Sequence, residues 1–310
     1  MGIHFGKAKV NAERKQMMFK IGIIGTENSH AREFANIFNK PNENGEYAFP
    51  DCRVTLVWGH FPEESERVVR ECGAERVASG IEEMVASVDA VMITARDGKY
   101  HTDFARPFVE AGIPAFVDKP FCTDPAEALS LARLAKEKGV PLCGGSSLKY
   151  AAGILEMKAA AEASGDKLHA GHVSAPLMMV NDYSGFWFYS AHLAEMCMEV
   201  FGWEPREVVA VENGGSVSAI VSYDGYSVAC NFTNDCGDSY SVSVFGEKTN
   251  HKAINLDGIF RAECEVFVKM LRTGEMAHSY EQLIAPVSFL DAIKRSYETK
   301  KAVAIDNKPV

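Results

Sequence analysis

The sequence predicts a two-domain α/β protein: a doubly wound parallel sheet first, then an α+β domain with a mostly antiparallel, open sheet. The chain has 310 residues, more than one ordinary core accommodates. Up to about residue 150, short apolar runs alternate with amphipathic helices, which indicates parallel strands joined by right-handed crossovers. Beyond that point strands follow one another directly. We therefore expect a disordered extension at 1–16 and domains at 17–150 and 151–310.

The first domain is expected to contain five strands and five helices. Gly112 and Gly139 stand where a helix C-cap favours glycine, and Pro125 suits a first helical turn. Short apolar runs place the strands at 19–25, 53–58, 89–94, 114–118 and 140–143. The helices are placed at 29–39, 62–72, 81–86, 100–111 and 125–138.

The second domain is expected to open with a helix at 153–163. Asp224-Gly225 predicts a two-residue hairpin turn. A helix that carries His192 interrupts the strands, and helices at 260–272 and 280–300 close the chain. The strands are placed at 169–176, 208–212, 216–223, 226–232, 240–245 and 251–254.

The composition excludes several classes of function. The chain has 32 basic and 42 acidic residues, a net charge of −10, which argues against nucleic acid or an anionic membrane as main partner. Its eight cysteines show neither a C-x-x-C pair nor a metal-ligand spacing, so we expect reduced thiols, no metal and a cytoplasmic location. No apolar run reaches the length of a membrane span.

The most informative stretch is the expected strand that ends in Asp118-Lys119-Pro120. Pro120 has no N–H, so it ends the strand ladder. In an open parallel sheet the carboxyl ends of the strands face the ligand crevice. Lys119 is therefore expected where chemistry takes place.

The turn after the first strand resembles a damaged dinucleotide fingerprint. Of the three glycines in G-x-G-x-x-G only Gly25 is present; Glu27 and His30 occupy the other two positions. A carboxylate at 27 repels phosphate unless it points away. The amides of the helix start still form an anion site. We expect cofactor contacts from Gly25, Thr26, Glu27, Asn28 and Ser29; the alternative is a turn that keeps the fold and binds nucleotide weakly or not at all.

The ends of two further expected strands are candidate positions for nucleotide contacts. The second ends in Trp58-Gly59-His60, without the acid that would hold an adenosine ribose, so NAD and NADP stay open, with His60 as a weak phosphate donor. The fourth is followed by Thr94-Ala95-Arg96. Arg96 could grip an anionic group with two N–H bonds or form a surface pair with Asp97.

These features together resemble the Gfo/Idh/MocA family of nicotinamide-dependent oxidoreductases over most of residues 19–306. The resemblance is strongest in the run 88–94, His101, Ala111-Gly112-Ile113-Pro114 and Asp118-Lys119-Pro120, where the family usually has Glu-Lys-Pro. The closing helix from Tyr280 is also similar. The resemblance implies a Rossmann-type first domain, NAD or NADP as cofactor, and a sugar, cyclitol or related polyol as substrate.

The resemblance also implies roles for residues. Lys119 would contact the reacting hydroxyl and the nicotinamide ribose, and His192 would be the acid/base of a D-x-G-x-H-x-x-D pattern, with Glu195 orienting it. Two positions of that pattern differ, since Phe188 replaces an acid and Ser190 a glycine. The cofactor side would include Thr94, Ala95, Arg96, His101 and Asp118. The remaining candidates are Asp182 and Tyr183 as alternative proton carriers and Lys149 beside the substrate.

Three functions are therefore weighed. The leading one is an NAD(P)-dependent dehydrogenase that transfers hydride between nicotinamide and a polyol-like substrate. The second is a non-redox ligand-binding or regulatory protein on the same scaffold, favoured by Glu27, His30 and Phe188. The third is a NAD-assisted glycoside hydrolase or lyase. The resemblance further implies a homo-oligomer formed through the open sheet of the second domain.

Overall fold

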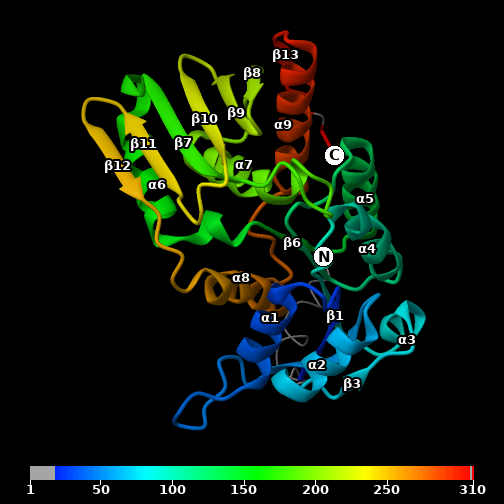
Figure 1. The fold of residues 1–310 in the computed structure, drawn as a ribbon. Helices are drawn as coiled ribbons and strands as arrows, with labels where there is room; N and C mark the ends of the chain where they lie inside the picture. Colours follow the sequence, from blue (N-terminus) through cyan, green and yellow to red (C-terminus); the bar gives the residue numbers. More distant parts are fainter. Residues whose placement is uncertain (1–17, 308) are drawn as a thin grey trace, which may run out of the picture.

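The structure is a computed structural model that describes residues 18–307 and 309–310; the extension expected at 1–16 lies outside this range. Figure 1 shows two lobes, each built on one sheet. The first lobe contains β1 to β6, and the second contains β7 to β13. A 3-10 turn at Ser147–Tyr150 joins β6 (Leu142–Gly145) of the first lobe to α6 (Ala152–Ser164) of the second.

The first sheet is parallel and has the strand order β3-β2-β1-β4-β5-β6. The order reverses between β1 and β4, which is the switch point where doubly wound sheets bind ligands. Its strands are β1 (Phe19–Ile24), β2 (Cys52–Trp58), β3 (Arg76–Val77), β4 (Ala90–Ile93), β5 (Ala115–Asp118) and β6 (Leu142–Gly145).

Helices cover both faces of this sheet, so its strands are apolar on both sides. One face packs against α3, α4 and α5, and the other against α1 and α2. The helices are α1 (Ser29–Asn39), α2 (Pro62–Cys72), α3 (Ile81–Val85), α4 (His101–Glu110) and α5 (Pro125–Lys138). The late helix α8 (Ile259–Thr273) also joins the α1 face, where Phe267 packs against Phe116 and Phe260 packs against Phe34. The chain thus returns to the first lobe near its end (Figure 1).

The second sheet has the order β12-β11-β7-β10-β9-β8-β13, and only its β7–β10 pair is parallel. One face packs against α6 (Ala152–Ser164), α7 (Trp187–Phe201) and α9 (Tyr280–Thr299). The alternating burial of β9 leaves the other face open. Its strands are β7 (Ala170–Leu177), β8 (Glu207–Asn213), β9 (Ser216–Ser222), β10 (Ser227–Asn234), β11 (Ser241–Phe245), β12 (Thr249–Ala253) and β13 (Val303–Ala304).

The architecture confirms the predicted fold class, and α1, α2 and α5 begin and end at the predicted residues. The Asp224-Gly225 turn forms as expected, with Gly225 at a φ of +88° and the Tyr223 N–H donating to the Tyr226 carbonyl at 2.9 Å. Two short edge strands, β3 and β13, were not predicted. Each has two residues, too few to show a period.

Candidate active site

The turn after β1 depends on a glycine. Gly25 has a φ of +95°, and a Cβ at this position would meet the Ala95 nitrogen at 2.1 Å. Thr94 Oγ1 fixes the same turn by donating to the Gly25 carbonyl at 3.1 Å. Asn28 caps α1 by accepting from the His30 N–H at 3.3 Å. The first amides of α1 therefore face the switch point and favour an anion there.

A cavity of about 350 Å³ opens beside this turn, between the ends of β1, β2 and β4. His60 forms one wall, with ring centroids 5.4 Å from those of Trp58, Tyr100 and Phe104. Gly59 lies in the same wall, where a Cβ would meet Thr26 Oγ1 at 2.6 Å. An aromatic wall of this kind suits a planar ring.

Two side chains close the cavity toward the second lobe. Glu27 Oε1 accepts from the Arg96 N–H at 3.0 Å, so the carboxylate lies across the turn. The Arg96 guanidinium donates to the Tyr183 hydroxyl at 3.1 Å and lies over that ring. The expected alternative partner, Asp97, is instead paired with Lys99 at 3.0 Å.

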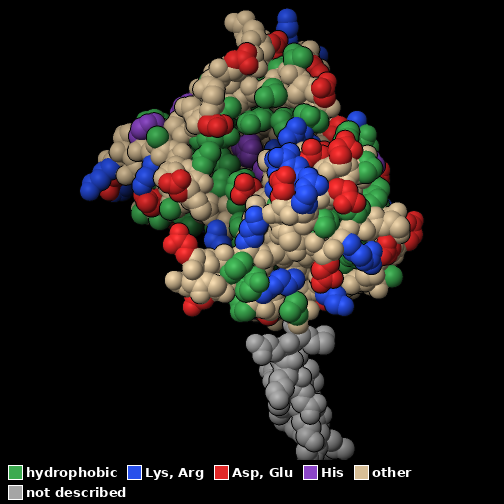
Figure 2. Space-filling view, turned by 60° about the horizontal axis from the view of Figure 1, so that its bottom comes forward, with side chains coloured by type: hydrophobic (Ala, Val, Ile, Leu, Met, Phe, Trp, Pro, Cys, Tyr) green, Lys and Arg blue, Asp and Glu red, His purple; other side chains and the backbone are tan. Residues whose placement is uncertain are grey.

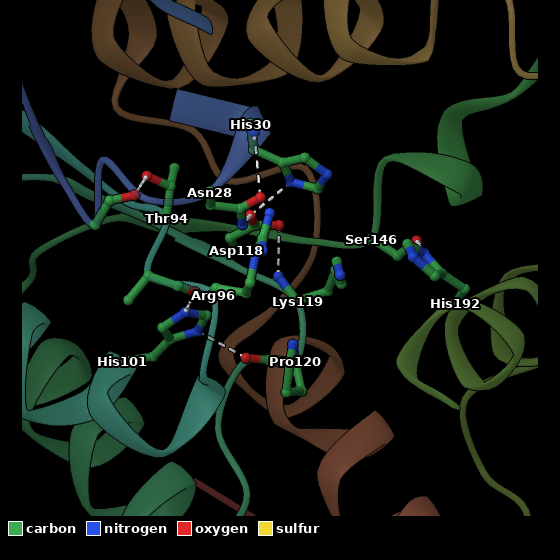
Figure 3. Close-up of polar contacts among 12 residues, drawn as sticks. Asn28, His30, Thr94, Arg96, His101, Asp118, Lys119, Pro120, Ser146 and His192 are labelled. Atoms are coloured by element: carbon green, nitrogen blue, oxygen red, sulfur yellow. Dashed lines mark hydrogen bonds and ion pairs between the residues drawn. The ribbon is translucent and has the colours of Figure 1, made fainter. Parts of the chain in front are cut away.

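Asp118 connects the turn after β1 to the Lys119 corner at the end of β5. Its Oδ2 lies 2.6 Å from His30 Nδ1, and its Oδ1 accepts from the Lys119 N–H at 2.7 Å. Burial by itself would raise the pKa of Asp118, but His30, Lys119 and His101 together outweigh burial and hold this pKa below its usual value. His30, at the position of the third fingerprint glycine, is thereby tied to the start of Asp118-Lys119-Pro120 (Figure 3).

Lys119 extends from the first lobe into the second (Figure 3). Its Nζ lies 3.5 Å from the Phe188 carbonyl, 4.5 Å from the centre of the Phe188 ring and 5.6 Å from that of Tyr189. The residue is 5% exposed. Burial lowers the pKa of Lys119, Asp118 partly opposes this effect, and Arg96 adds to it. The amine is therefore readier to lose a proton than an exposed lysine.

His192 lies one turn along α7 from the residues that Lys119 contacts. Its Nδ1 is 2.7 Å from Ser146 Oγ, which follows β6, and its ring packs edge-on against Tyr189 and Tyr240. Burial, followed by the charges of Lys119 and His30, lowers the pKa of His192 well below its usual value. The imidazole is therefore neutral near pH 7, as a general base must be.

Glu195 and Lys149 form a buried ion pair beneath this histidine. Glu195 Oε2 lies 2.7 Å from Lys149 Nζ, and Oε1 accepts from the Ser146 N–H at 2.7 Å. Glu195 raises the pKa of Lys149 although burial opposes it. Glu195 therefore acts on the Ser146 backbone, and reaches His192 through Ser146. Lys149, expected beside the substrate, points to Glu195 and to the Gly144 carbonyl at 2.6 Å.

Two further buried side chains, His101 and Glu263, lie near Lys119. His101 joins the loop after β4 to the Lys119–Pro120 corner, with its ring nitrogens 2.7 Å from the carbonyls of Ala95 and of Pro120. Glu263 of α8 is 2% exposed, and neither carboxyl oxygen has a partner among the described residues. Burial, followed by Asp118, raises its pKa well above the usual value, which favours the neutral acid.

Figure 2 shows a hollow near the middle of the face drawn, with histidine and hydrophobic side chains inside it. Lys119, His192 and Glu195 are all buried, at 5%, 7% and 3% exposed. A larger groove of about 780 Å³ lies elsewhere, between the start of α5 and α9, and contains none of the predicted site residues. Among residues 18–307 and 309–310, no three His, Cys, Asp or Glu side chains are placed to hold a metal ion.

Comparison with known proteins finds similar sequences and folds. Residues 19–145 match the family model Gfo/Idh/MocA, described as an oxidoreductase family with an NAD-binding Rossmann fold. The match covers the first lobe, which is therefore similar to this family's nucleotide-binding domain. Over 99 residues it is 31% identical to the myo-inositol dehydrogenase Hyg17 of Streptomyces leeuwenhoekii; this alignment spans 32% of the chain and 30% of the relative.

Solved structures show the same fold over nearly the whole chain. GenD2 from gentamicin A biosynthesis, solved with NAD, has a TM-score of 0.81 at 18% identity and covers 94% of this chain and 97% of its own. Scyllo-inositol dehydrogenase from Lactobacillus casei, solved with NAD(H) and scyllo-inositol, has a TM-score of 0.79 at 16% identity and covers 93% of this chain and 99% of its own. At these identities the likeness shows the fold.

The sequence analysis missed one residue of the site, Ser146, and one contact, between His30 and Asp118. Ser146 holds His192 and accepts the Leu148 N–H at 3.2 Å. Its place directly after a strand of the parallel sheet was the available signal. The His30–Asp118 contact joins residues 88 positions apart, and no local pattern indicates such a pair.

The Lys149–Glu195 pair yields a stability prediction. Lys149→Met leaves Glu195 buried without its counter-charge, so the free energy of unfolding should fall by about 3–5 kcal/mol. Lys149→Met/Glu195→Gln removes both charges and keeps an acceptor for the Ser146 N–H, so it should regain most of this loss. Lys136→Met, which breaks the exposed pair with Glu281, should cost less than about 1 kcal/mol. Urea unfolding measures these three variants and Glu195→Gln alone; a double-variant loss equal to the sum of the two single losses would contradict the coupling.

Proposed function

We propose that the protein is an NAD(P)-dependent dehydrogenase that oxidises or reduces a carbinol carbon of a sugar, cyclitol or related polyol. One observation carries the proposal. Lys119 follows β5, whose last residue, Asp118, contacts His30 at the start of α1. The Lys119 amine reaches Phe188 and Tyr189 of α7 in the second lobe, one turn from His192. The inositol dehydrogenases among the similar proteins support a cyclitol-like substrate.

The residues present fit the adenosine half of a dinucleotide. Gly25 and Gly59 leave room that a Cβ would fill, the start of α1 offers amides to a pyrophosphate, and His60 belongs to an aromatic wall. Arg96 and Lys119 supply positive charge on the side toward β5. The nicotinamide, when bound, supplies the hydride acceptor or donor.

The chain's own residues supply positioning and proton transfer. Lys119 would hold the reacting oxygen with its ammonium group, and His192 Nε2 would take the hydroxyl proton. For this the imidazole keeps its N–H on Nδ1, which donates to Ser146 Oγ at 2.7 Å and leaves Nε2 free. Glu195 positions Ser146 rather than the substrate. Burial of the cluster strengthens each of these interactions.

Phe188 lies one turn before His192, at the position where the pattern of the resembled family has an acid. Its ring faces the Lys119 ammonium at 4.5 Å, a cation–π contact in place of a second ion pair. Without a carboxylate here, proton transfer falls to His192 alone, and Lys119 keeps its lowered pKa. The Phe188 and Glu27 substitutions also favour the second candidate, a non-redox ligand-binding protein on this scaffold.

Activity assays test these roles. A panel of cyclitols, sugars and polyols with NAD and NADP, followed by absorbance of the reduced nucleotide, should identify a substrate. His192→Ala should lower kcat about 10²–10⁴-fold with little change in nucleotide affinity. Lys119→Ala should lower kcat/KM to a similar extent. His251→Ala, on the exposed strand β12, is the matched control.

Two outcomes would contradict the proposal. Nucleotide binding without turnover of any substrate would favour the ligand-binding protein. Tight binding with retained, recycled nucleotide and cleavage of a glycoside would favour a NAD-assisted hydrolase or lyase. Loss of nucleotide binding in Lys119→Ala, with kcat unchanged at saturation, would remove its chemical role.

The pH dependence follows from the lowered pKa of His192. Oxidation needs the neutral imidazole, so kcat/KM should stay level from pH 7 down past 6.5 and fall only as the pH passes through the depressed pKa. His30→Asn removes one of the charges that lower this pKa, so its acidic limb should move to higher pH. A wild-type limb above pH 6.5 would contradict the assignment.

We propose that the open face of the second sheet joins two copies of the chain. Val209 and Ile220 are paired across β8 and β9 with 48% and 52% of their surface exposed, and Val211 next to them has 63%. An apolar patch of this kind on a solvent face favours a partner surface. Light scattering should give a dimer or larger assembly that Ile220→Lys dissociates, whereas Val180→Lys in an exposed loop should not. A monomeric wild type would contradict this.

We also propose that the protein is located in the cytoplasm. All eight cysteines are free thiols, and all except Cys236 are buried, which supports a reducing compartment such as the cytoplasm. In the part of the chain that the structure describes, no helix is both long and apolar enough to cross a membrane.

A further inference from the structure

We propose that Glu27 recognises the adenosine ribose and makes the protein select NAD over NADP. This inference rests on the proposed function and adds the residue that discriminates between the two nucleotides. In doubly wound sheets an acid at the end of β2 accepts hydrogen bonds from the ribose 2′-hydroxyl. Here that strand ends in Trp58-Gly59-His60, and the carboxylate comes from the turn after β1 instead.

The position of the Glu27 carboxylate supports this role. A Cβ at Gly59 would lie 3.5 Å from Glu27 Oε2, so the carboxylate occupies the neighbourhood of the β2 end. Glu27 and Gly59 line the same cavity as His60, Tyr100 and Phe104. The ribose of an adenosine seated against that aromatic wall would therefore lie beside the carboxylate.

The two oxygens of Glu27 have different surroundings. Oε1 accepts from the Arg96 N–H at 3.0 Å, which fixes the orientation of the carboxylate. Oε2 is buried and has no hydrogen-bond partner among the described residues. A buried acceptor without a donor is unfavourable, and a ribose hydroxyl is a donor of suitable strength. Glu27 thus has one oxygen for orientation and one for a ligand.

The surrounding charges favour NAD. A 2′-phosphate would bring two negative charges next to the Glu27 carboxylate. The nearby cations already have partners: Lys99 lies 3.0 Å from Asp97, and the Arg96 guanidinium bonds Tyr183 at 3.1 Å. Neither cation is thus an unpartnered charge placed for a 2′-phosphate, and the Glu27 carboxylate opposes one.

Calorimetric titration tests the inference with four probes: NAD, NADP, ADP-ribose and 2′-phospho-ADP-ribose. The wild type should bind NAD and ADP-ribose at least tenfold more tightly than their 2′-phosphorylated forms. Glu27→Gln should weaken NAD about tenfold or more and leave NADP unchanged or tighter, bringing the affinity ratio near one. Glu63→Gln, on the exposed first turn of α2, should leave both affinities unchanged.

A second variant separates recognition from obstruction. Glu27→Gly restores the fingerprint glycine; if Glu27 recognises ribose, this variant loses NAD preference. If it tightens NAD and NADP equally, the carboxylate only blocks the pyrophosphate and the inference is overturned. Equal wild-type binding of NAD and NADP also overturns it and leaves the dehydrogenase proposal standing. Binding of neither nucleotide overturns both. Thermal melting of each variant checks that it is folded.

Discussion

The contact between Lys119 and the start of α7 is the interaction on which the site depends. The Lys119 residue is 5% exposed; its amine lies against the Phe188 carbonyl and ring in the second lobe, and the charge of Asp118 acts on it from the first. Because α7 also carries His192, this contact fixes the amine and the imidazole relative to each other. The shared hydrophobic cluster of α5, α7 and α9 keeps the lobes in that relation.

The buried charges around this contact are arranged mostly in pairs. Asp118 lies 2.6 Å from His30 and Glu195 lies 2.7 Å from Lys149; the two carboxylates also accept from the backbone N–H groups of Lys119 and Ser146. Buried pairs of this kind add little net stability. Glu263 is the exception, a buried carboxyl kept neutral by its surroundings.

Positions that depart from the family pattern have acquired other contacts. His30 replaces a packing glycine and bonds Asp118, Phe188 replaces an acid and faces Lys119, and Glu27 replaces a glycine and bonds the Arg96 N–H. The His30 and Glu27 contacts each join two segments at the same edge of the first sheet, and Phe188 joins α7 to the end of β5. The turn after β1 is consequently connected to the end of β5 by side chains.

The sequence by itself determined the two sheets, nearly all helix bounds and the placement of Lys119 at a strand end, because hydrophobic periods, caps and Asp118-Lys119-Pro120 are local signals. It also indicated His192 through its resemblance to the family. Only the tertiary structure decided that Glu195 acts through Ser146, that His30 reaches Asp118, and that α8 belongs to the first lobe's core. These contacts join residues tens to hundreds of positions apart, and side-chain direction across an interface follows from packing that no local pattern encodes.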